Sequence, residues 1–257
     1  MKSSISKPTL FLPKDGEMPL GRLPSSSFIR ESGMISLNRW QNLAISYCEF
    51  DQAQFSQSLF SELHIKFPEK LNQSVTKRKA EYLAGRCSVQ QAFQAAGLAW
   101  EPPGIGRHGE PCWPAGINGS ISHSKALAVA VVSKREDYPF LGIDVEELIS
   151  QNVAKQIQSE VLLPDELHLS KSIKLDETEF LTWVFSAKET LFKAIHKYVG
   201  KYFGYECAQV IDFKLESGKI LLELTVNLAP GLHKGRRFTC ITSKLSDHFL
   251  TLIASSG

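Results

Sequence analysis

The chain has 257 residues, 43% of them apolar and 22% charged, a composition that predicts a globular protein with a buried core rather than a disordered chain. Its 29 basic and 27 acidic side chains leave a formal net charge of +2, which argues against nucleic acid as the main partner. The five cysteines form no CxxC pair and no Cys/His cluster, so the sequence indicates neither a zinc site nor a disulfide framework. No stretch approaches the roughly 20 apolar residues of a membrane helix, and the N-terminus has no signal-peptide core, so we expect a reducing cytoplasm as the location.

The first half of the chain predicts few regular elements. Residues 1–35 are rich in proline, glycine and serine, and we expect an irregular arm there. Residues 42–51 alternate in polarity and predict a strand. Residues 74–96 contain helix-forming residues and no proline, which predicts a helix. Residues 97–120 are rich in glycine and proline and predict a long loop, of a kind that is usually functional or disordered.

The second half is more regular. The run ALAVAVV at 126–132 predicts a strand buried on both faces, and residues 141–148 predict another short strand. A long helix is expected over 177–199. The last fifty residues hold alternating segments separated by turn residues, a pattern typical of paired antiparallel strands. The prediction is therefore a mixed α+β fold with two halves of similar size that meet near 137–141.

Two acidic residues stand two positions apart in the segment GIDVE at 142–146. Side chains at i and i+2 of a strand lie on one face, so the carboxylates of Asp144 and Glu146 are expected to point the same way. Two like charges this close repel each other, and Mg²⁺, which binds carboxylate and phosphate oxygens, would compensate that repulsion. The alternative is an edge strand whose acidic face lies in water.

A second candidate site lies in the predicted helix 177–199. Glu189 falls opposite the apolar stripe of that helix, and Lys193, four residues later, lies beside it. Because Phe185 and Phe192 flank Glu189, we expect the Glu189 and Lys193 side chains to be largely buried, at the junction of the two halves. Buried charges need partners, and a metal ion with a phosphate group would serve both. The alternative is a solvent-exposed ion pair.

A third candidate site combines hydroxyl and basic side chains. The segment GSISHS at 119–124 is expected to form a turn before the buried strand, where its hydroxyls and His123 can hydrogen-bond to a phosphate. In the first predicted helix, Arg78 and Arg86 are eight residues apart, which places both guanidinium groups on one face about 12 Å apart. Arginine suits phosphate oxygens. The alternatives are a structural histidine and a solvated basic face.

Together these segments resemble the 4′-phosphopantetheinyl transferases, in the branch typified by enterobactin synthase component D. The matching segments are KRKAEYLAGR (77–86), GEPCWPAG (109–116), GSISHS (119–124), GIDVE (142–146) and FSAKETLFKA (185–194). They follow the family's order and approximate spacing, and the resemblance covers roughly residues 74–208. It implies an α+β fold of two pseudo-symmetric α/β halves, 1–138 and 139–257, with the active site in the cleft between them.

The resemblance also implies roles for individual residues. Asp144, Glu146 and Glu189 look like the Mg²⁺ ligands, and Glu189 and Lys193 like the catalytic residues. Lys193 also looks like the lysine that contacts the phosphates of coenzyme A, the co-substrate. The residues implied at its nucleotide end, in the N-terminal half, are Arg78, Arg86, Arg107, His108, Ser122 and His123, with His123 at the 3′-phosphate. Phe185 stands where other branches of the family have tryptophan, which affects local packing.

The implied reaction transfers the 4′-phosphopantetheine moiety of coenzyme A to a serine of an apo carrier protein and releases adenosine 3′,5′-bisphosphate. Glu189 or a water on the metal would take the serine proton. The component D branch favours peptidyl or aryl carrier domains of siderophore synthetases as partners, and we expect a monomer. Two alternatives are a metal-dependent phosphohydrolase, which would not need the Ser-His segment, and a non-catalytic carrier-protein binding module, which would be expected to have lost one of the three acids.

Overall fold

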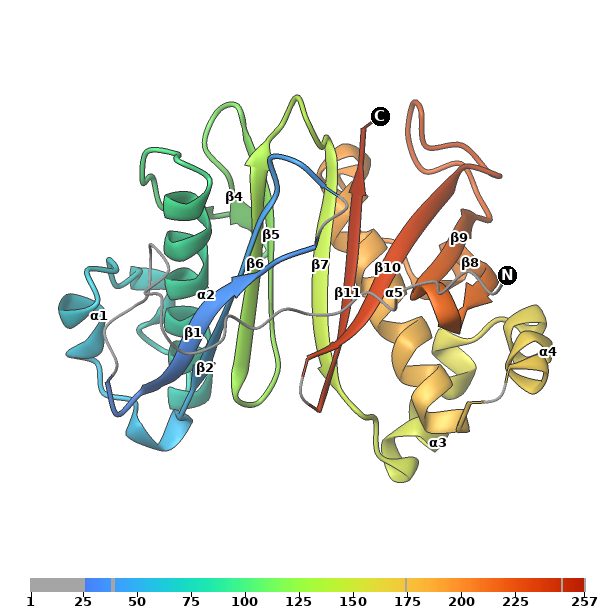
Figure 1. Cartoon of the computed structure of the whole chain (residues 1–257), viewed down its shortest axis with the longest axis horizontal. Coiled ribbons are helices and arrows are strands. Elements are labelled where there is room, and N and C mark those ends of the chain that lie inside the picture. Colours follow the sequence, from blue (N-terminus) through green and yellow to red (C-terminus); the bar gives the residue numbers. More distant parts are fainter. Residues whose placement is uncertain (1–25, 38–39, 174, 246, 257) are drawn as a thin grey trace, which may run out of the picture. The chain divides into compact units, whose positions relative to one another are not determined.

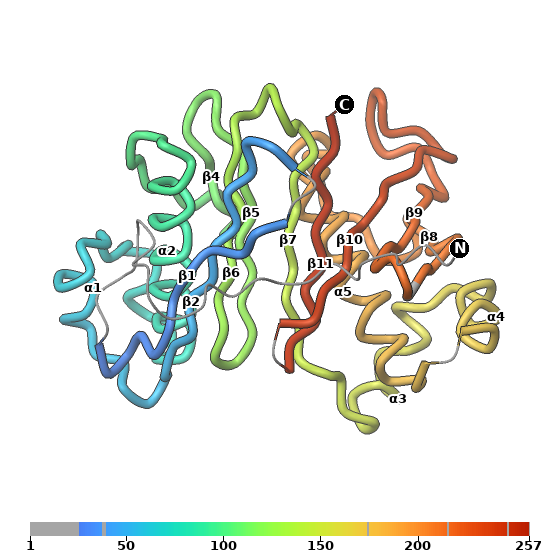
Figure 2. Tube along the Cα trace, viewed as in Figure 1, coloured from blue at the N-terminus to red at the C-terminus, as the bar shows by residue number. Residues whose placement is uncertain are grey.

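The computed structural model describes residues 26–37, 40–173, 175–245 and 247–256. The chain separates between Tyr138 and Pro139 into two compact units, and Figure 2 traces the backbone through both. We call residues 26–138 the N-terminal unit and residues 139–256 the C-terminal unit. The irregular arm expected at the N-terminus lies, up to residue 25, outside the described residues. The pseudo-symmetric arrangement of the halves around a cleft stays a prediction.

The N-terminal unit is built on a four-stranded antiparallel sheet with the order β1-β2-β6-β5. These strands are β1 (Ile29–Ile35), β2 (Ala44–Phe50), β5 (Ile117–His123) and β6 (Leu127–Lys134). Seven consecutive residues of β6 are buried, which confirms the strand predicted from the apolar run at 126–132. The strand predicted at 42–51 is confirmed as β2.

Helix α2 (Thr76–Ala95) covers one face of this sheet and packs on β6 and β2 (Figure 1), which confirms the helix expected over 74–96. Its sheet-facing residues are small or aliphatic, and Ala80, Leu83 and Ala84 are fully buried. A side chain added at Gly85 would place its Cβ 3.1 Å from Ile121, so the helix lies close to β5 at this point. The approach brings the basic residues of α2 next to the end of β5.

Three expectations for the N-terminal unit are wrong, the third being that for the GSISHS segment, described in the next paragraph. Residues 29–35 form strand β1 rather than part of an irregular arm, because they pair with β2 and Gly33 makes room for the ring of Tyr47, 2.9 Å from where a Cβ would lie. The predicted loop 97–120 contains a short hairpin and the start of β5. The remaining elements of this unit are η1 (Gln52–Gln54), α1 (Leu59–Glu62), η2 (Glu69–Leu71), β3 (Gly104–Ile105) and β4 (Pro111–Cys112).

The GSISHS segment is a strand and not a turn. Ser122 pairs with Val129 of β6, and His123 pairs with Ala128. Small hydroxyl residues favour turns when they stand alone, but here the long apolar strand β6 supplies a pairing partner. As a result, successive side chains of this segment point to opposite faces of the sheet.

The C-terminal unit contains a five-stranded antiparallel sheet with the order β7-β11-β10-β9-β8. Its strands are β7 (Phe140–Glu147), β8 (Ala208–Lys214), β9 (Lys219–Leu224), β10 (Arg237–Leu245) and β11 (His248–Ser255). Two 3₁₀ turns, η3 (Tyr205–Cys207) and η4 (Leu215–Ser217), flank β8. The strand expected at 141–148 and the paired C-terminal strands are confirmed, and so is the mixed α+β class.

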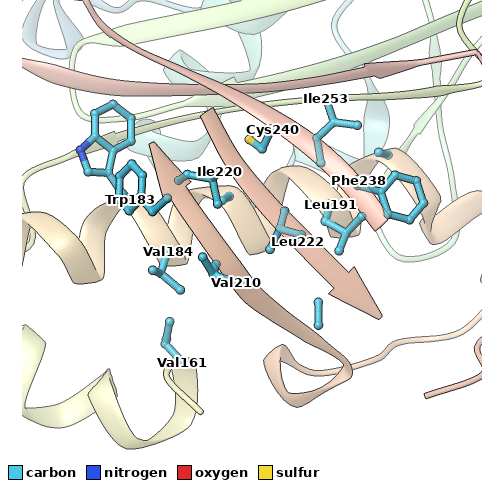
Figure 3. Close-up of a cluster of buried hydrophobic side chains, with 14 of the residues drawn as sticks. Val161, Trp183, Val184, Leu191, Val210, Ile220, Leu222, Phe238, Cys240 and Ile253 are labelled. Atoms are coloured by element: carbon cyan, nitrogen blue, oxygen red, sulfur yellow. The ribbon is translucent and has the colours of Figure 1, made fainter. Parts of the chain in front are cut away.

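The long helix expected over 177–199 is confirmed as α5 (Glu177–Val199), and both of its ends carry sequence signals. The side chain of Asp176 accepts a hydrogen bond from the Thr178 amide at the first turn, and Gly200 ends the helix with a left-handed φ of 70°. The apolar face of α5 packs on the sheet (Figure 3). The labelled side chains there are Val161, Trp183, Val184, Leu191, Val210, Ile220, Leu222, Phe238, Cys240 and Ile253.

Helices α3 (Gln151–Val161) and α4 (Pro164–Ser172) lie between β7 and α5 along the chain and were not predicted. They are linked to α5 by a buried ion pair between Lys188 and Glu166, whose side chains are 2% and 0% exposed and 2.7 Å apart. The ammonium of Lys188 also donates to the Val161 carbonyl at 2.7 Å. Burial lowers the pKa of Lys188, and the charge of Glu166 opposes that shift.

The thiols of the chain fall into two classes. Cys48 and Cys87 are buried in the N-terminal unit and Cys207 and Cys240 in the C-terminal unit, whereas Cys112 on β4 is exposed. Burial raises the pKa of Cys87 to about 12 and also raises the pKa of Cys48 and Cys240. Among the described residues, no helix is both long enough and apolar enough to span a membrane.

Candidate functional site

The acidic residues of β7 face helix α5. A Cβ added at Gly142 would lie 2.1 Å from the Thr190 carbonyl oxygen, so this face of the strand touches the helix backbone. Asp144 and Glu146 follow on the same face by the alternation of a strand. Asp144 is 2% exposed, whereas Glu146, nearer the end of β7, is partly exposed.

Each carboxylate oxygen of Asp144 has its own donor from α5. The Lys193 ammonium lies 2.6 Å from Oδ1, and the Ser186 hydroxyl donates to Oδ2 at 2.7 Å. Ser186 and Lys193 are seven residues apart, which is about two helical turns, so they share a face of the helix. The close approach of α5 at Gly142 is what allows both donors to reach the strand.

Two further hydroxyls continue this contact into the core. Ser186 Oγ lies 2.8 Å from Thr251 Oγ1 on β11, and Thr190 Oγ1 lies 2.6 Å from the same atom. All three hydroxyl residues are fully buried. Because Ser186 gives its single proton to Asp144, it cannot also donate to Thr251, and the Thr251 hydroxyl in turn donates to the Ser186 carbonyl at 3.0 Å. These hydrogen bonds fix the rotamer of Ser186 and, through it, the orientation of Asp144.

The other two predicted ligands, Glu146 and Glu189, belong to the same electrostatic environment. Burial and the charges of Asp144, Glu189 and Glu147 together raise the pKa of Glu146 to about 8, against the opposing effect of the Lys193 charge. Glu189 Oε1 accepts a hydrogen bond from the Tyr205 hydroxyl at 2.6 Å. The carboxylates of β7 and α5 therefore interact electrostatically.

The carboxylates of Asp144, Glu146 and Glu189 are suitable ligands for a divalent cation. Their side chains are not, however, arranged around a common point. Within the described ranges, no three His, Cys, Asp or Glu side chains are grouped so that they could hold a metal ion. The Lys193 ammonium lies against Asp144, and the Tyr205 hydroxyl lies against Glu189. A positive charge thus already stands beside Asp144, which is the compensation that clustered carboxylates require and that a hard cation provides.

Glu189 and Lys193 are only partly buried, and the Lys193 side chain is 26% exposed. Their cover within the C-terminal unit includes aromatic residues that follow α5. A cavity of about 60 Å³ is lined by Glu189 and Phe192 together with Tyr202, Phe203 and Tyr205. No prediction covered this segment, although the aromatic residues that follow Gly200 are a signal that could have indicated it.

A second cavity, of about 120 Å³, lies in the N-terminal unit between α2, β5 and the β3–β4 hairpin. Its lining includes Arg78, Arg86 and His123, three of the residues predicted to hold the nucleotide. Arg78 NH1 lies 3.2 Å from His123 Nε2. Arg86 is only 5% exposed, and its guanidinium lies over the ring of Tyr82 at 4.7 Å. Guanidinium and imidazole groups around a small cavity provide donors for an anion.

The other residues predicted for the nucleotide are not part of this lining. Ser122 is buried and, by strand alternation, points to the opposite face from His123. Arg107 and His108 lie exposed in the hairpin, whose Gly109 and Pro111 do line the cavity. Glu81 also lines the cavity, a position that no sequence pattern indicated.

Comparison with known proteins gives two matches to family models. The model described as the 4′-phosphopantetheinyl transferase N-terminal domain matches residues 67–133. The model described as the 4′-phosphopantetheinyl transferase superfamily matches residues 140–249. Between them, the two matched stretches contain Arg78, His123, Asp144 and Glu189.

Individual relatives agree with the family models. Enterobactin synthase component D of Salmonella typhi is 35% identical over 146 residues, which are 57% of this chain and 59% of that protein. A 4′-phosphopantetheinyl transferase of Nocardia iowensis is 30% identical over 152 residues, 56% of this chain and 64% of that protein. This chain thus spans less than two thirds of both.

Coverage is higher for enterobactin synthase component D of Escherichia coli strain K12, which is 36% identical over 150 residues, 58% of this chain and 69% of that protein. With this match and the two consecutive family models, the chain belongs to the 4′-phosphopantetheinyl transferase superfamily, in the branch of enterobactin synthase component D.

Proposed function

We propose that this protein transfers the 4′-phosphopantetheine moiety of coenzyme A to a serine of an apo carrier protein. The observation that carries the proposal is the arrangement around Asp144, where a buried carboxylate, two further acids and Lys193 lie on facing elements of a chain in this superfamily. Such a combination of carboxylates and a cation suits the handling of a pyrophosphate.

In the proposed reaction the serine oxygen attacks the β-phosphorus of coenzyme A. A new P–O bond forms to the serine, the bond to the bridging oxygen breaks, and adenosine 3′,5′-bisphosphate leaves. Asp144, Glu146 and Glu189 would hold Mg²⁺, which when bound neutralises charge on the pyrophosphate. Lys193 supplies a second positive charge near the leaving phosphate once its ammonium moves from Asp144 to the substrate.

Glu189 is the candidate base for the serine proton. Its Oε1 already accepts a hydrogen bond from a hydroxyl group, that of Tyr205, at 2.6 Å. A general base must lie within hydrogen-bond reach of the proton that it takes, and this contact supports the assignment because a hydroxyl can approach that oxygen.

In the N-terminal unit, Arg78, Arg86 and His123 would bind the nucleotide end of coenzyme A, with His123 at the 3′-phosphate. The shared cavity that these residues line supports this part of the proposal. The family resemblance adds Ser122, Arg107 and His108 to the same role, and their positions outside the lining make these three the weaker assignments.

The partner is proposed to be a carrier domain of siderophore synthesis, because several relatives bear the name enterobactin synthase component D. We also propose that the protein acts as a monomer in the cytoplasm, a location favoured by its free thiols, which persist in reducing compartments.

Mass spectrometry of an apo peptidyl or aryl carrier domain, incubated with the protein, coenzyme A and Mg²⁺, tests the proposal. The expected result is a carrier that gains the mass of phosphopantetheine on its serine and adenosine 3′,5′-bisphosphate as the second product. Hydrolysis of coenzyme A without any change in carrier mass would instead identify a phosphohydrolase. Carrier binding with no reaction would identify a binding module.

A further inference from the structure

The cavity of the N-terminal unit contains an acid among its basic residues. Glu81 lines it together with Arg78, Arg86 and His123, and the Glu81 side chain is only 10% exposed. A carboxylate in this position repels an incoming anion, so its presence needs a specific explanation. The Lys77 ammonium and His123 Nδ1 each lie 3.8 Å from its Oε1.

The contacts of His123 determine where its ring carries a proton. The guanidinium of Arg78 has only donors, so His123 Nε2, which lies 3.2 Å from NH1, accepts that hydrogen bond. The proton of the neutral ring is therefore on Nδ1, the nitrogen that faces Glu81. The His123 imidazole thus lies between the Glu81 carboxylate and the Arg78 guanidinium.

Binding of a phosphate changes what His123 must do. Phosphate oxygens accept hydrogen bonds, so Nε2 can contact one only by donating. A neutral ring could donate only by moving its proton to Nε2, which would turn the bare Nδ1 toward the Glu81 carboxylate, so the contact favours a second proton on the ring. Arg78 is at the same time free to turn its guanidinium to the phosphate. Of the charged groups beside Glu81 and in the cavity lining, Lys77 and Arg86 are both on α2, and the hairpin contributes Gly109 and Pro111 to the lining.

We propose that Glu81 is a positioning residue for His123: it keeps the proton on Nδ1 and stabilises the imidazolium that forms when a phosphate group enters the cavity. Binding of the nucleotide then takes up one proton from solvent, and this proton resides on His123 Nε2. The inference rests on the proposed function, which identifies the anion as the 3′-phosphate of coenzyme A.

Isothermal titration calorimetry of the full chain with adenosine 3′,5′-bisphosphate, in buffers of different ionisation enthalpy, measures this proton uptake. At pH 8, where a free imidazole is neutral, we expect the wild type to take up about one proton per site. His123→Gln should abolish the uptake. Glu81→Gln should reduce it, and the Kd of this variant relative to wild type should rise severalfold between pH 6 and pH 8.

The control is Glu62→Gln, which neutralises an exposed carboxylate of α1 in the same unit and should behave as wild type. Circular dichroism verifies folding. If Glu81→Gln does not fold, Glu81→Asp, which retracts the charge by one methylene, replaces it and should also lower the uptake.

Nucleotide binding without proton uptake, or with the same uptake in the Glu81 variants, overturns the inference and leaves the proposed function intact. Failure of the folded wild type to bind the nucleotide at millimolar concentration counts against the proposed function itself, and the inference fails with it.

Discussion

At the scale of single residues, the Asp144 carboxylate is the most constrained charged group of the candidate site. It is buried, and its two oxygens are held separately by Lys193 and Ser186. Hydrogen bonds to charged groups contribute about 1.5–3 kcal/mol to stability, more than the roughly 1 kcal/mol of a neutral pair. The Ser186 hydroxyl is therefore expected to matter more than other buried hydroxyls of α5.

Ser186→Ala should lower the free energy of unfolding by about 1.5–3 kcal/mol, because it removes a donor from a buried carboxylate. Ser46→Ala in β2 is the control, since Ser46 is equally buried and its hydroxyl donates to a neutral carbonyl, that of Ser88. The control should lose about 1 kcal/mol. Urea denaturation measures both, and equal losses would show that Ser186 has no special relation to Asp144.

Exchanging Glu189 and Lys193 tests whether the candidate site needs each residue at its own position or only one acidic and one basic side chain. The double substitution Glu189→Lys with Lys193→Glu puts a carboxylate opposite Asp144 and an ammonium against Tyr205. We expect a loss of carrier modification and of stability, because both residues lose the partners that they have here. An active and stable double variant would contradict the assigned roles.

The control for this swap is an ion pair of the same unit with no proposed role. Lys244 and Glu179 lie 2.7 Å apart with their side chains 55% and 25% exposed. Exchanging these two charges should change stability by less than about 1 kcal/mol and leave carrier modification unchanged. Mass spectrometry of the carrier and urea denaturation, applied to both swaps, make the comparison.

At the scale of elements, the Lys188–Glu166 ion pair joins α5 to α4 and β8. Glu166 also accepts hydrogen bonds from the amides of Leu163 and Val210, at 2.7 and 2.6 Å. Breaking a buried pair on one side costs about 3–5 kcal/mol because the remaining charge is left uncompensated. Both partners are buried deeply enough for this argument to apply.

Glu166→Leu should therefore destabilise the protein by about 3–5 kcal/mol, and the double variant Glu166→Leu with Lys188→Met should be more stable than Glu166→Leu alone. Lys188→Met alone should cost less than Glu166→Leu, since Glu166 keeps two amide donors. Thermal and urea unfolding give the four values of the cycle. If the loss of unfolding free energy in the double variant equals the sum of the losses in the two single variants, Glu166 and Lys188 are not energetically coupled.

The packing of α5 on β7 depends on the missing side chain at Gly142. Gly142→Ala would place a Cβ 2.1 Å from the Thr190 carbonyl oxygen, so the helix has to move away from the strand. We expect a loss of stability at or above the upper end of the ~1–3 kcal/mol of overpacked cores. Gly104→Ala, whose Cβ would make an ordinary 3.6 Å contact, is the control. Near-wild-type stability of Gly142→Ala would contradict the tight contact.

Local patterns explain which elements the sequence could predict. Helices α2 and α5 and strand β6 could be predicted because their helix-forming residues and apolar runs lie within each segment. Strand β1 was missed because Gly33 and Ser32 weaken its pattern, and the partner that stabilises it, Tyr47, lies on another strand. The GSISHS segment has the local pattern of a turn for the same reason, since its pairing with β6 is not a local property.

At the scale of the whole molecule, the resemblance and strand alternation together indicated the acids of β7 and the Glu and Lys of α5. Neither the resemblance nor strand alternation could predict contacts between residues far apart in sequence. Thr251, which bonds to Ser186, is 65 residues from it, and the Tyr205 contact with Glu189 depends on how the chain turns after Gly200. Glu81 had no signal, because a single acid in a basic helix usually faces solvent.

Each unit contains two buried cysteines, so the rate at which their thiols react measures how often that unit opens. A short pulse of an alkylating reagent should modify Cys112 first, because it is exposed, and the buried thiols only when their unit opens. Cys48 and Cys87 would follow opening of the N-terminal unit, while Cys207 and Cys240 would follow the C-terminal unit. Peptide mass spectrometry would therefore yield two opening free energies from unmodified protein, and adding nucleotide should first slow the alkylation of Cys48 and Cys87.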